Sequence, residues 1–332
     1  MQHHHNNIRT PKNVLVVGCG NLGRWHIKGI EQSVYDVHVD AVDPDLRAIE
    51  GLANFIKSEN IDGEKLSISS WRSLSDCLAN EARKYDLVIV STLAEGRPDV
   101  VAEICKSIPF NYMLLEKPIA QSTEEIEMIE RTAKGRKTFV NHARRMMPWH
   151  KDIQTQLASF GRLSCEINFP SLGIACNTSH YIDLVNWWTG ELPVRVKTGG
   201  LSNVWQKAKR VGFWEAVGEI VIEFDGGSSL KITSGDVDSV SRITVAGKTK
   251  RQCSIDEISG EAVFDGDTIL KGAMLPQSRL TGALLDTLCQ RQECDLPTLS
   301  LAAQCNKIFT TSLLGHWNNC KINQQRTSLP IT

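Results

Sequence analysis

The chain has 332 residues, enough for two domains of ordinary size, and its formal net charge is −1 at pH 7. A chain so close to neutral has no overall attraction to nucleic acid or to an anionic membrane surface. No apolar run approaches the roughly 20 residues that cross a bilayer, and the polar residues 1–10 lack the apolar core of a secretory signal.

The ten cysteines indicate a reducing compartment. They are scattered through a long chain and form no C-x-x-C pair. Buried free thiols therefore explain them better than disulfides do. The one close pair, Cys289 and Cys294, lacks the partners of a zinc site, and the histidines show no paired ligand spacing. We expect a cytoplasmic protein without a metal ion.

The stretch from Asn13 to Asp43 predicts a strand, a glycine turn, a helix and a second strand. Residues 13–17 are apolar, the turn reads G-C-G-N-L-G, and apolar residues then recur at helical spacing. Each part suits a dinucleotide: Gly18 allows the tight turn, Gly20 lets the backbone approach a pyrophosphate, and Gly23 lets the helix pack closely. The free amides at the helix start, from Asn21 and Leu22 onward, can face the phosphates.

Asp43 decides which dinucleotide we expect. It ends the second apolar run, twenty residues after the last glycine of the turn. A carboxylate there accepts hydrogen bonds from both ribose hydroxyls and repels a 2′-phosphate, so NAD is favoured over NADP. Arg47, one helical turn on, partly offsets that repulsion.

Strand-like and helix-like segments then alternate as far as residue 141. The alternation predicts a parallel sheet with helices on both faces, as in a Rossmann dinucleotide-binding domain at 8–141. Ser91 and Thr92 follow a buried strand and fall at the carboxyl edge of the sheet, where such folds bind ligands. Ser122 and Glu125 form a capping box. The expected strands are 66–69, 86–90, 112–115 and 137–140, and the expected helices are 44–58, 74–84, one from 98 and one after 122.

The pattern changes after residue 141 and predicts an α+β domain at 142–330. Residues 162–169 alternate like a half-exposed strand, 178–188 form a helix, and the chain is then mostly β until 272. The sequences D-G-G at 225–227 and D-G at 265–266 predict hairpin turns. Two closing helices, about 279–289 and 300–316, complete this domain. No flexible linker separates the two domains, so we expect them to pack together.

Three short stretches carry a family resemblance. They are Glu116-Lys117-Pro118, the run N-H-A-R-R-M-M-P at 141–148, and the run C-N-T-S-H-Y-I-D at 176–183. Together with the glycine turn, they resemble the glucose-fructose oxidoreductase, inositol dehydrogenase and MocA (Gfo/Idh/MocA) family. The resemblance implies a Rossmann domain followed by a domain with a large, mostly antiparallel open sheet. It also implies a sugar, sugar derivative or cyclitol substrate, sometimes nucleotide-activated, between the domains and a homo-oligomer, either a dimer or a tetramer.

The resemblance also gives chemical roles to Lys117 and His180. When a hydride leaves a secondary alcohol for the nicotinamide, a nearby group must accept the hydroxyl proton. An imidazole titrates near neutral pH and suits that role, so His180 is the expected base. Asp183, on the same helical face, would hold the ring in one tautomer, and Lys117 would polarise the reacting oxygen. A histidine packed into the core beside Trp187 is the competing interpretation.

Further contacts follow from the same stretches. Glu116 and Lys117 lie at the expected nicotinamide end of the cofactor, while Lys117, Arg144, Asn177 and His180 are the expected substrate contacts. For Arg144 the alternative is an ion pair with a neighbouring carboxylate. For Asn177 it is a helix cap before residue 178.

The chain departs from the family at three positions. Cys176 stands where many members carry an aspartate, Leu93 where a proline is common, and Arg97 where a histidine is frequent.

Two alternatives to a dehydrogenase stay open. One is an enzyme with tightly bound, transiently reduced NAD that cleaves glycosides or epimerises sugars. The other is a non-catalytic NAD-binding sensor, which the Cys176 departure favours.

Overall fold

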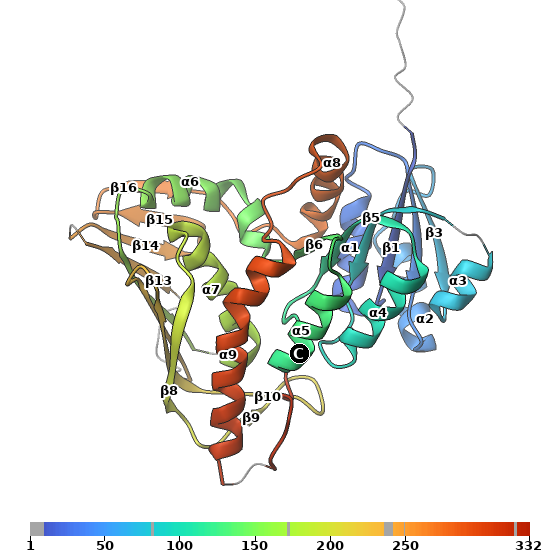
Figure 1. The fold of residues 1–332 in the computed structure, drawn as a ribbon. Helices are drawn as coiled ribbons and strands as arrows, with labels where there is room; N and C mark the ends of the chain where they lie inside the picture. Colours follow the sequence, from blue (N-terminus) through green and yellow to red (C-terminus); the bar gives the residue numbers. More distant parts are fainter. Residues whose placement is uncertain (1–9, 81–82, 171–172, 236–241, 249, 322–323) are drawn as a thin grey trace, which may run out of the picture.

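The computed structural model describes residues 10–80, 83–170, 173–235, 242–248, 250–321 and 324–332, so residues 8 and 9 of the expected first domain lie outside it. Two sheets organise the chain, one of six strands and one of eight, and helix α9 (Leu299–Asn319) lies between them (Figure 1). None of the helices in these ranges is both long and apolar enough to cross a bilayer.

The six-stranded sheet has the strand order of a Rossmann domain. Every neighbouring pair is parallel, and the order is β3-β2-β1-β4-β5-β6. The direction of winding reverses between β1 and β4, which leaves a crevice at their carboxyl ends. The strands are β1 (Lys12–Val17), β2 (Val37–Val42), β3 (Leu66–Trp71), β4 (Tyr85–Val90), β5 (Phe110–Leu115) and β6 (Lys137–Val140). The predicted parallel sheet is confirmed.

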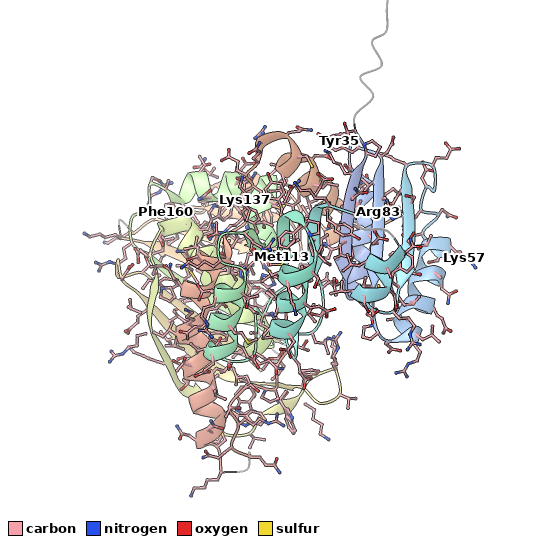
Figure 2. All side chains as sticks on the ribbon, turned by 45° about the vertical axis from the view of Figure 1, so that its right-hand side comes forward. Tyr35, Lys57, Arg83, Met113, Lys137 and Phe160 are labelled. Carbon is pink, nitrogen blue, oxygen red and sulfur yellow. The ribbon has the colours of Figure 1, made fainter. Side chains whose placement is uncertain are left out.

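Helices cover both faces of this sheet, as the near-continuous apolar strands predict. Figure 2 shows the contrast between Met113 of β5, which is fully buried among other side chains, and Lys57 at the outer edge. The Ser122 side chain accepts a hydrogen bond from the Glu125 amide and caps its helix as predicted. The helices are α1 (Asn21–Ile30), α2 (Leu46–Ser58), α3 (Leu74–Asn80), α4 (Arg97–Ser107) and α5 (Thr123–Thr132).

The eight-stranded sheet is mostly antiparallel. Its order is β16-β15-β14-β13-β7-β12-β11-β8, and only the β7–β12 pair is parallel among these strands. Ile220, Ile222 and Phe224 are buried while the residues between them are not, as expected for a sheet with one wet face. The strands are β7 (Leu163–Phe169), β8 (Pro193–Leu201), β11 (Gly218–Phe224), β12 (Ser229–Ser234), β13 (Arg242–Gly247), β14 (Gln252–Asp256), β15 (Glu261–Phe264) and β16 (Thr268–Lys271).

Helices α6 (Pro148–Leu157), α7 (Ile174–Thr189) and α9 cover the buried face of this sheet. The sequence analysis did not predict α6, since it gave no element between residues 148 and 162. It also started α7 four residues late, at 178, with Asn177 considered as its possible cap, whereas Gly173 precedes the helix. A separate pair of short strands, β9 (Gln206–Lys207) and β10 (Trp214–Glu215), lies beside the start of α7.

Helix α8 (Thr281–Arg291) corrects the expectation that the closing helices belong with the second sheet. Its Leu284, Leu285 and Leu288 are buried in one cluster with Val14 and Val16 of β1. The helix therefore covers the first sheet, beside α1 (Figure 1). An amphipathic helix shows in its sequence that one face is buried but not against which sheet. The division at 141 and 142 into separate domains stays a prediction.

Candidate active site

The glycine turn between β1 and α1 is shaped by its own close contacts at two of its three glycines. Gly18 has φ +101°, and a Cβ there would lie 2.8 Å from the Thr92 amide nitrogen. A Cβ on Gly23 would lie 1.9 Å from the Gly18 carbonyl oxygen. A Cβ on Gly20 would meet nothing within 4 Å. The open side of Gly20 is the space that a pyrophosphate needs for close approach, as the sequence analysis expected.

The start of α1 suits a bound phosphate. Gly20 precedes the helix and offers no side chain to the first amides, those of Asn21 and Leu22, and the first turn holds no acidic residue. Nearby, the Thr92 hydroxyl is buried without a hydrogen-bond partner among the described residues. These unsatisfied donors fit a dinucleotide. Ser91 instead supports the turn, since its hydroxyl donates to the Gly18 carbonyl at 2.7 Å.

Asp43 directly follows β2, and its side chain binds the backbone of the glycine turn. Its Oδ2 accepts from the Cys19 amide at 2.8 Å, and its Oδ1 accepts from the Asp45 amide at 2.9 Å. Arg47, which we expected to offset its charge, pairs with Asp45 instead at 3.3 Å and points into solvent. The carboxylate is thus fixed in orientation at the sheet edge.

Glu116 is buried, and its side chain is occupied by the protein itself. Its Oε1 accepts from His26 at 2.8 Å and from Asn141 at 2.5 Å. Burial raises the pKa of this carboxyl, but the hydrogen bonds from His26 and Asn141 and the charges of His26 and Lys117 together outweigh burial, so the pKa is lowered. Asn141 also donates to Gln277, and His26 contacts Thr281 at 3.0 Å. The side chain expected at the cofactor therefore ties β5 to α1 and α8.

Arg97 has a role that the sequence analysis did not find. Its side chain is fully buried, and it donates to the carbonyl oxygens of Thr92, Glu116, Pro118 and Ile119. Burial lowers the pKa of Arg97 to about 10. The guanidinium therefore fixes the loop after β4 to the loop after β5. In the sequence, Arg97 follows a turn glycine, Gly96, and this position did not indicate that its side chain joins the two loops.

Lys117 reaches from the first sheet to the helix of the second. Its Nζ donates to the Cys176 carbonyl and to the Asn177 Oδ1, each at 3.3 Å, and lies 4.0 Å from the Cys176 sulfur. The Asn177 Nδ2 donates to the Gly173 carbonyl at 3.1 Å. Asn177 therefore lies within α7 and does not cap it. Both ends of its amide are occupied.

His180 follows one turn later on α7 and is partly buried. Its Nδ1 lies 3.3 Å from the Nδ1 of His142, a buried residue that the sequence analysis did not single out. Burial, then the charges of Lys117 and Arg144, lower the pKa of His180 well below its ordinary range. The ring is therefore neutral at neutral pH. Its contact with a second imidazole shows that it is not enclosed by apolar neighbours alone.

Asp183 does not orient His180, contrary to expectation. Its carboxylate accepts from Arg145 Nε at 2.9 Å and from Arg145 Nη2 at 2.8 Å. Both residues are buried. Three-residue spacing places Asp183 on the face of His180, but a rigid guanidinium fork captures the carboxylate. The H-x-x-D sequence therefore serves the packing of α7.

Arg144 is likewise paired within the protein. It donates to both carboxylate oxygens of Glu257, at 2.6 and 2.7 Å, and to the Tyr181 hydroxyl at 3.3 Å. Burial raises the pKa of Glu257, but the charges and hydrogen bonds of Arg144 and then His150 together outweigh burial and bring that pKa to about 2. The ion pair that we considered as the alternative for Arg144 is present. The Nε and Nη2 atoms of Arg144 are engaged by Glu257 and Tyr181, which leaves few N–H groups of this guanidinium for a substrate.

A cavity of about 940 Å³ adjoins Lys117 through Cys176 and Asn177. Glu215 of β10 lines it, and its Oε2 accepts from the Ala175 amide at 2.9 Å and the Cys176 amide at 3.3 Å. Burial raises the pKa of Glu215 to about 7. The Cys176 thiol donates to the Thr332 carbonyl at the cavity wall. No sequence motif pointed to Glu215, because the β9–β10 pair that places it is too short to recognise.

Metal ligands are not assembled at this site. Across the ranges that the structure describes, no three His, Cys, Asp or Glu side chains come together as a metal ion would need.

Comparison with known proteins supports the sequence resemblance. Residues 12–142 match a family model described as "Oxidoreductase family, NAD-binding Rossmann fold", that of Gfo/Idh/MocA. No curated protein matches the chain.

Solved structures share the whole fold at low sequence identity. UDP-N-acetylglucosamine 3-dehydrogenase from Acidithiobacillus ferrooxidans is 16% identical, with a TM-score of 0.65 over 92% of this chain and 97% of that one. A myo-inositol dehydrogenase from Corynebacterium glutamicum is 13% identical, with a TM-score of 0.63 over 92% and 96%. Biliverdin reductase from Synechocystis, solved with NADP+, is 14% identical, with a TM-score of 0.68 over 92% and 98%.

The family model matches only the first domain, whereas the solved structures are similar to the chain over both sheets. Residues 12–142 therefore match the NAD-binding Rossmann fold of the Gfo/Idh/MocA oxidoreductase family, and the solved structures share the fold of both sheets.

Proposed function

We propose that the chain is an NAD-dependent dehydrogenase that oxidises a secondary hydroxyl of a sugar derivative or cyclitol, with Lys117 and His180 as its catalytic residues. The contact of Lys117 with the first turn of α7 carries the proposal. That ammonium lies 3.3 Å from two oxygens of α7, the helix that also bears His180, and its charge contributes to the lowered pKa of His180. The Lys117 ammonium, which follows β5 of the first sheet, therefore lies against α7, the helix that carries the His180 imidazole.

The protonation states suit oxidation of an alcohol. When bound, a nicotinamide supplies the hydride acceptor. The neutral imidazole of His180 takes the hydroxyl proton, since its lowered pKa keeps it unprotonated at neutral pH. An ammonium has three N–H donors, and Lys117 directs two of them to Cys176 and Asn177. The third donates to the reacting oxygen and stabilises the negative charge that develops there.

NAD is the proposed cofactor because of Asp43. Its carboxylate is fixed by the amides of Cys19 and Asp45, and Arg47 pairs with Asp45 at 3.3 Å. A 2′-phosphate beside Asp43 would meet a negative charge. The relatives support the substrate class, since two of those compared are named as dehydrogenases of a UDP-amino sugar and of myo-inositol.

Turnover and cofactor binding, measured separately, test this function. Wild type and the variants Lys117→Met and His180→Ala are assayed for NADH formation on a panel of cyclitols, sugars and UDP-sugars. We expect wild-type turnover with NAD in preference to NADP. Each variant should lose turnover by at least about 100-fold while calorimetry shows unchanged NAD affinity. Lys134→Met, on an exposed turn far from α7, is the control. Full activity in either site variant would overturn its role.

A further inference from the structure

The cavity beside Lys117 is bounded on one side by positive charge. Lys207, at the end of β9, and Lys209 and Arg210, from the segment that joins β9 to β10, line its wall. The first turn of α7 lines the same cavity with Cys176 and Asn177, both of which Lys117 contacts. The three cations and the proposed reaction centre therefore face the same space.

These cations are not neutralised by carboxylates of the described residues. Lys207 and Lys209 form no ion pair there, and Arg210 only donates to the Thr332 hydroxyl at 3.3 Å. Cations on the outer face of the large sheet behave differently, because Lys197 pairs with Glu223 and Lys271 with Glu261. Three charges of one sign in a four-residue segment repel one another. An anion in the cavity would relieve that repulsion.

Among the described residues that line the cavity, Glu215 supplies a side-chain carboxyl, and it is engaged by the start of α7. Glu215 accepts from the amides of Ala175 and Cys176 at the start of α7. It approaches them over Gly173, where a Cβ would lie 2.3 Å from its Oε1. Since burial raises its pKa to about 7, its negative charge is only partly present at neutral pH. It therefore opposes an anionic ligand less than an ordinary glutamate would.

We propose that Lys207, Lys209 and Arg210 form a subsite for a negatively charged group on the substrate, phosphoryl or carboxylate, while its reacting carbinol lies at Lys117 and His180. The volume of about 940 Å³ falls in the range of small-molecule sites and accommodates a ligand as large as a nucleoside diphosphate sugar. The assignment of the anion as part of a substrate rests on the proposed function. The binding of the anion does not.

Calorimetry with four probes tests the subsite. UDP, glucose 6-phosphate and glucuronate carry the diphosphate, phosphoryl and carboxylate groups, and glucose carries none. Wild type should bind at least one anionic probe ten times more tightly than glucose. A triple variant, Lys207→Gln with Lys209→Gln and Arg210→Gln, should weaken that binding at least tenfold, because charge-assisted hydrogen bonds are lost. The most tightly bound probe identifies the group.

The control removes the same charge elsewhere. Arg195→Gln with Lys197→Gln and Lys271→Gln neutralises three exposed cations on the large sheet and should leave anion binding unchanged. Equal losses in the two triple variants, or no preference for any anionic probe, would overturn the subsite. Lys117→Met separates the two proposals. If it retains turnover while anion binding still depends on the β9–β10 segment, the proposed function fails and the subsite stands.

Discussion

The Nδ1 atom of His142 lies 3.3 Å from the Nδ1 atom of His180, so each ring has another imidazole as its partner. Only one of the two atoms can carry the shared proton. When His180 accepts a substrate proton at Nε2, its Nδ1 must be the donor to His142. In the proposed mechanism, His142 would therefore take the orienting position that the H-x-x-D sequence had suggested for Asp183.

The pH dependence of alcohol oxidation should reflect the lowered pKa of His180. Burial, Lys117 and Arg144 disfavour its protonated form, so the base stays neutral as the pH falls through 6.5. We expect kcat/KM for oxidation to hold through that value and to fall only at lower pH. The measurement is a pH profile in wild type and in Glu215→Gln, which removes a group that titrates near 7. A fall in kcat/KM at pH 6.5 or above, as the pH is lowered, in both proteins would contradict the role of His180 as the base.

Two glycines of the turn should respond in opposite ways to the same substitution. Gly20→Ala places its Cβ in open space, so thermal stability should be unchanged. NAD affinity should nevertheless fall at least about tenfold, because the methyl group occupies the approach of the pyrophosphate. Gly23→Ala sets its Cβ against the Gly18 carbonyl and should lower the melting temperature. Thermal melts with and without NAD separate the effects. Unchanged NAD affinity in Gly20→Ala would count against phosphate binding there.

Loss of Arg145 should damage stability rather than chemistry. Arg145→Met leaves the buried Asp183 carboxylate without its guanidinium, which costs about 3 to 5 kcal/mol of unfolding free energy for a buried pair. Urea unfolding measures the change. Lys197→Met breaks the exposed pair with Glu223 and should cost much less, because solvent screens an exposed pair. A similar small effect in both variants would show that the buried pair contributes little.

The buried carboxyl of Glu215 should make stability fall as the pH rises. Its pKa is about 7 when folded against an ordinary 4.5, so between these values the folded protein binds a proton that the unfolded chain does not. The stabilisation from this bound proton is complete below pH 4.5 and is lost as the pH rises through 7. The two pKa values differ by about 2.5 units, and at about 1.36 kcal/mol per pKa unit the loss amounts to about 3 kcal/mol. Relative to wild type, Glu215→Gln should be more stable at pH 8.5 than at pH 4.5. Parallel pH curves from urea unfolding would disprove the raised pKa.

Local sequence was enough to predict the first sheet, the glycine turn, the strand at 162–169 and the mostly β character of the chain from there to residue 272, but not the separate strands of the second sheet. Gly18, Gly23 and Asp43 act through neighbours that adjoin the same turn, so their spacing carried the information. Apolar runs and alternating strands likewise show their own burial. The resemblance of 116–118 and 176–183 to one family gave Lys117 and His180 roles at one substrate, and the contact of Lys117 with α7 was found only in the structure.

Only the tertiary structure decided which partner each polar side chain takes. Asp183 lies three residues from His180 but pairs with Arg145, while His142, 38 residues away in the chain, meets His180 instead. Glu215 and α8 likewise find their places through contacts between segments far apart in the chain. Spacing along a helix fixes a face, whereas a hydrogen bond depends on which groups the packing of other elements brings within about 3 Å.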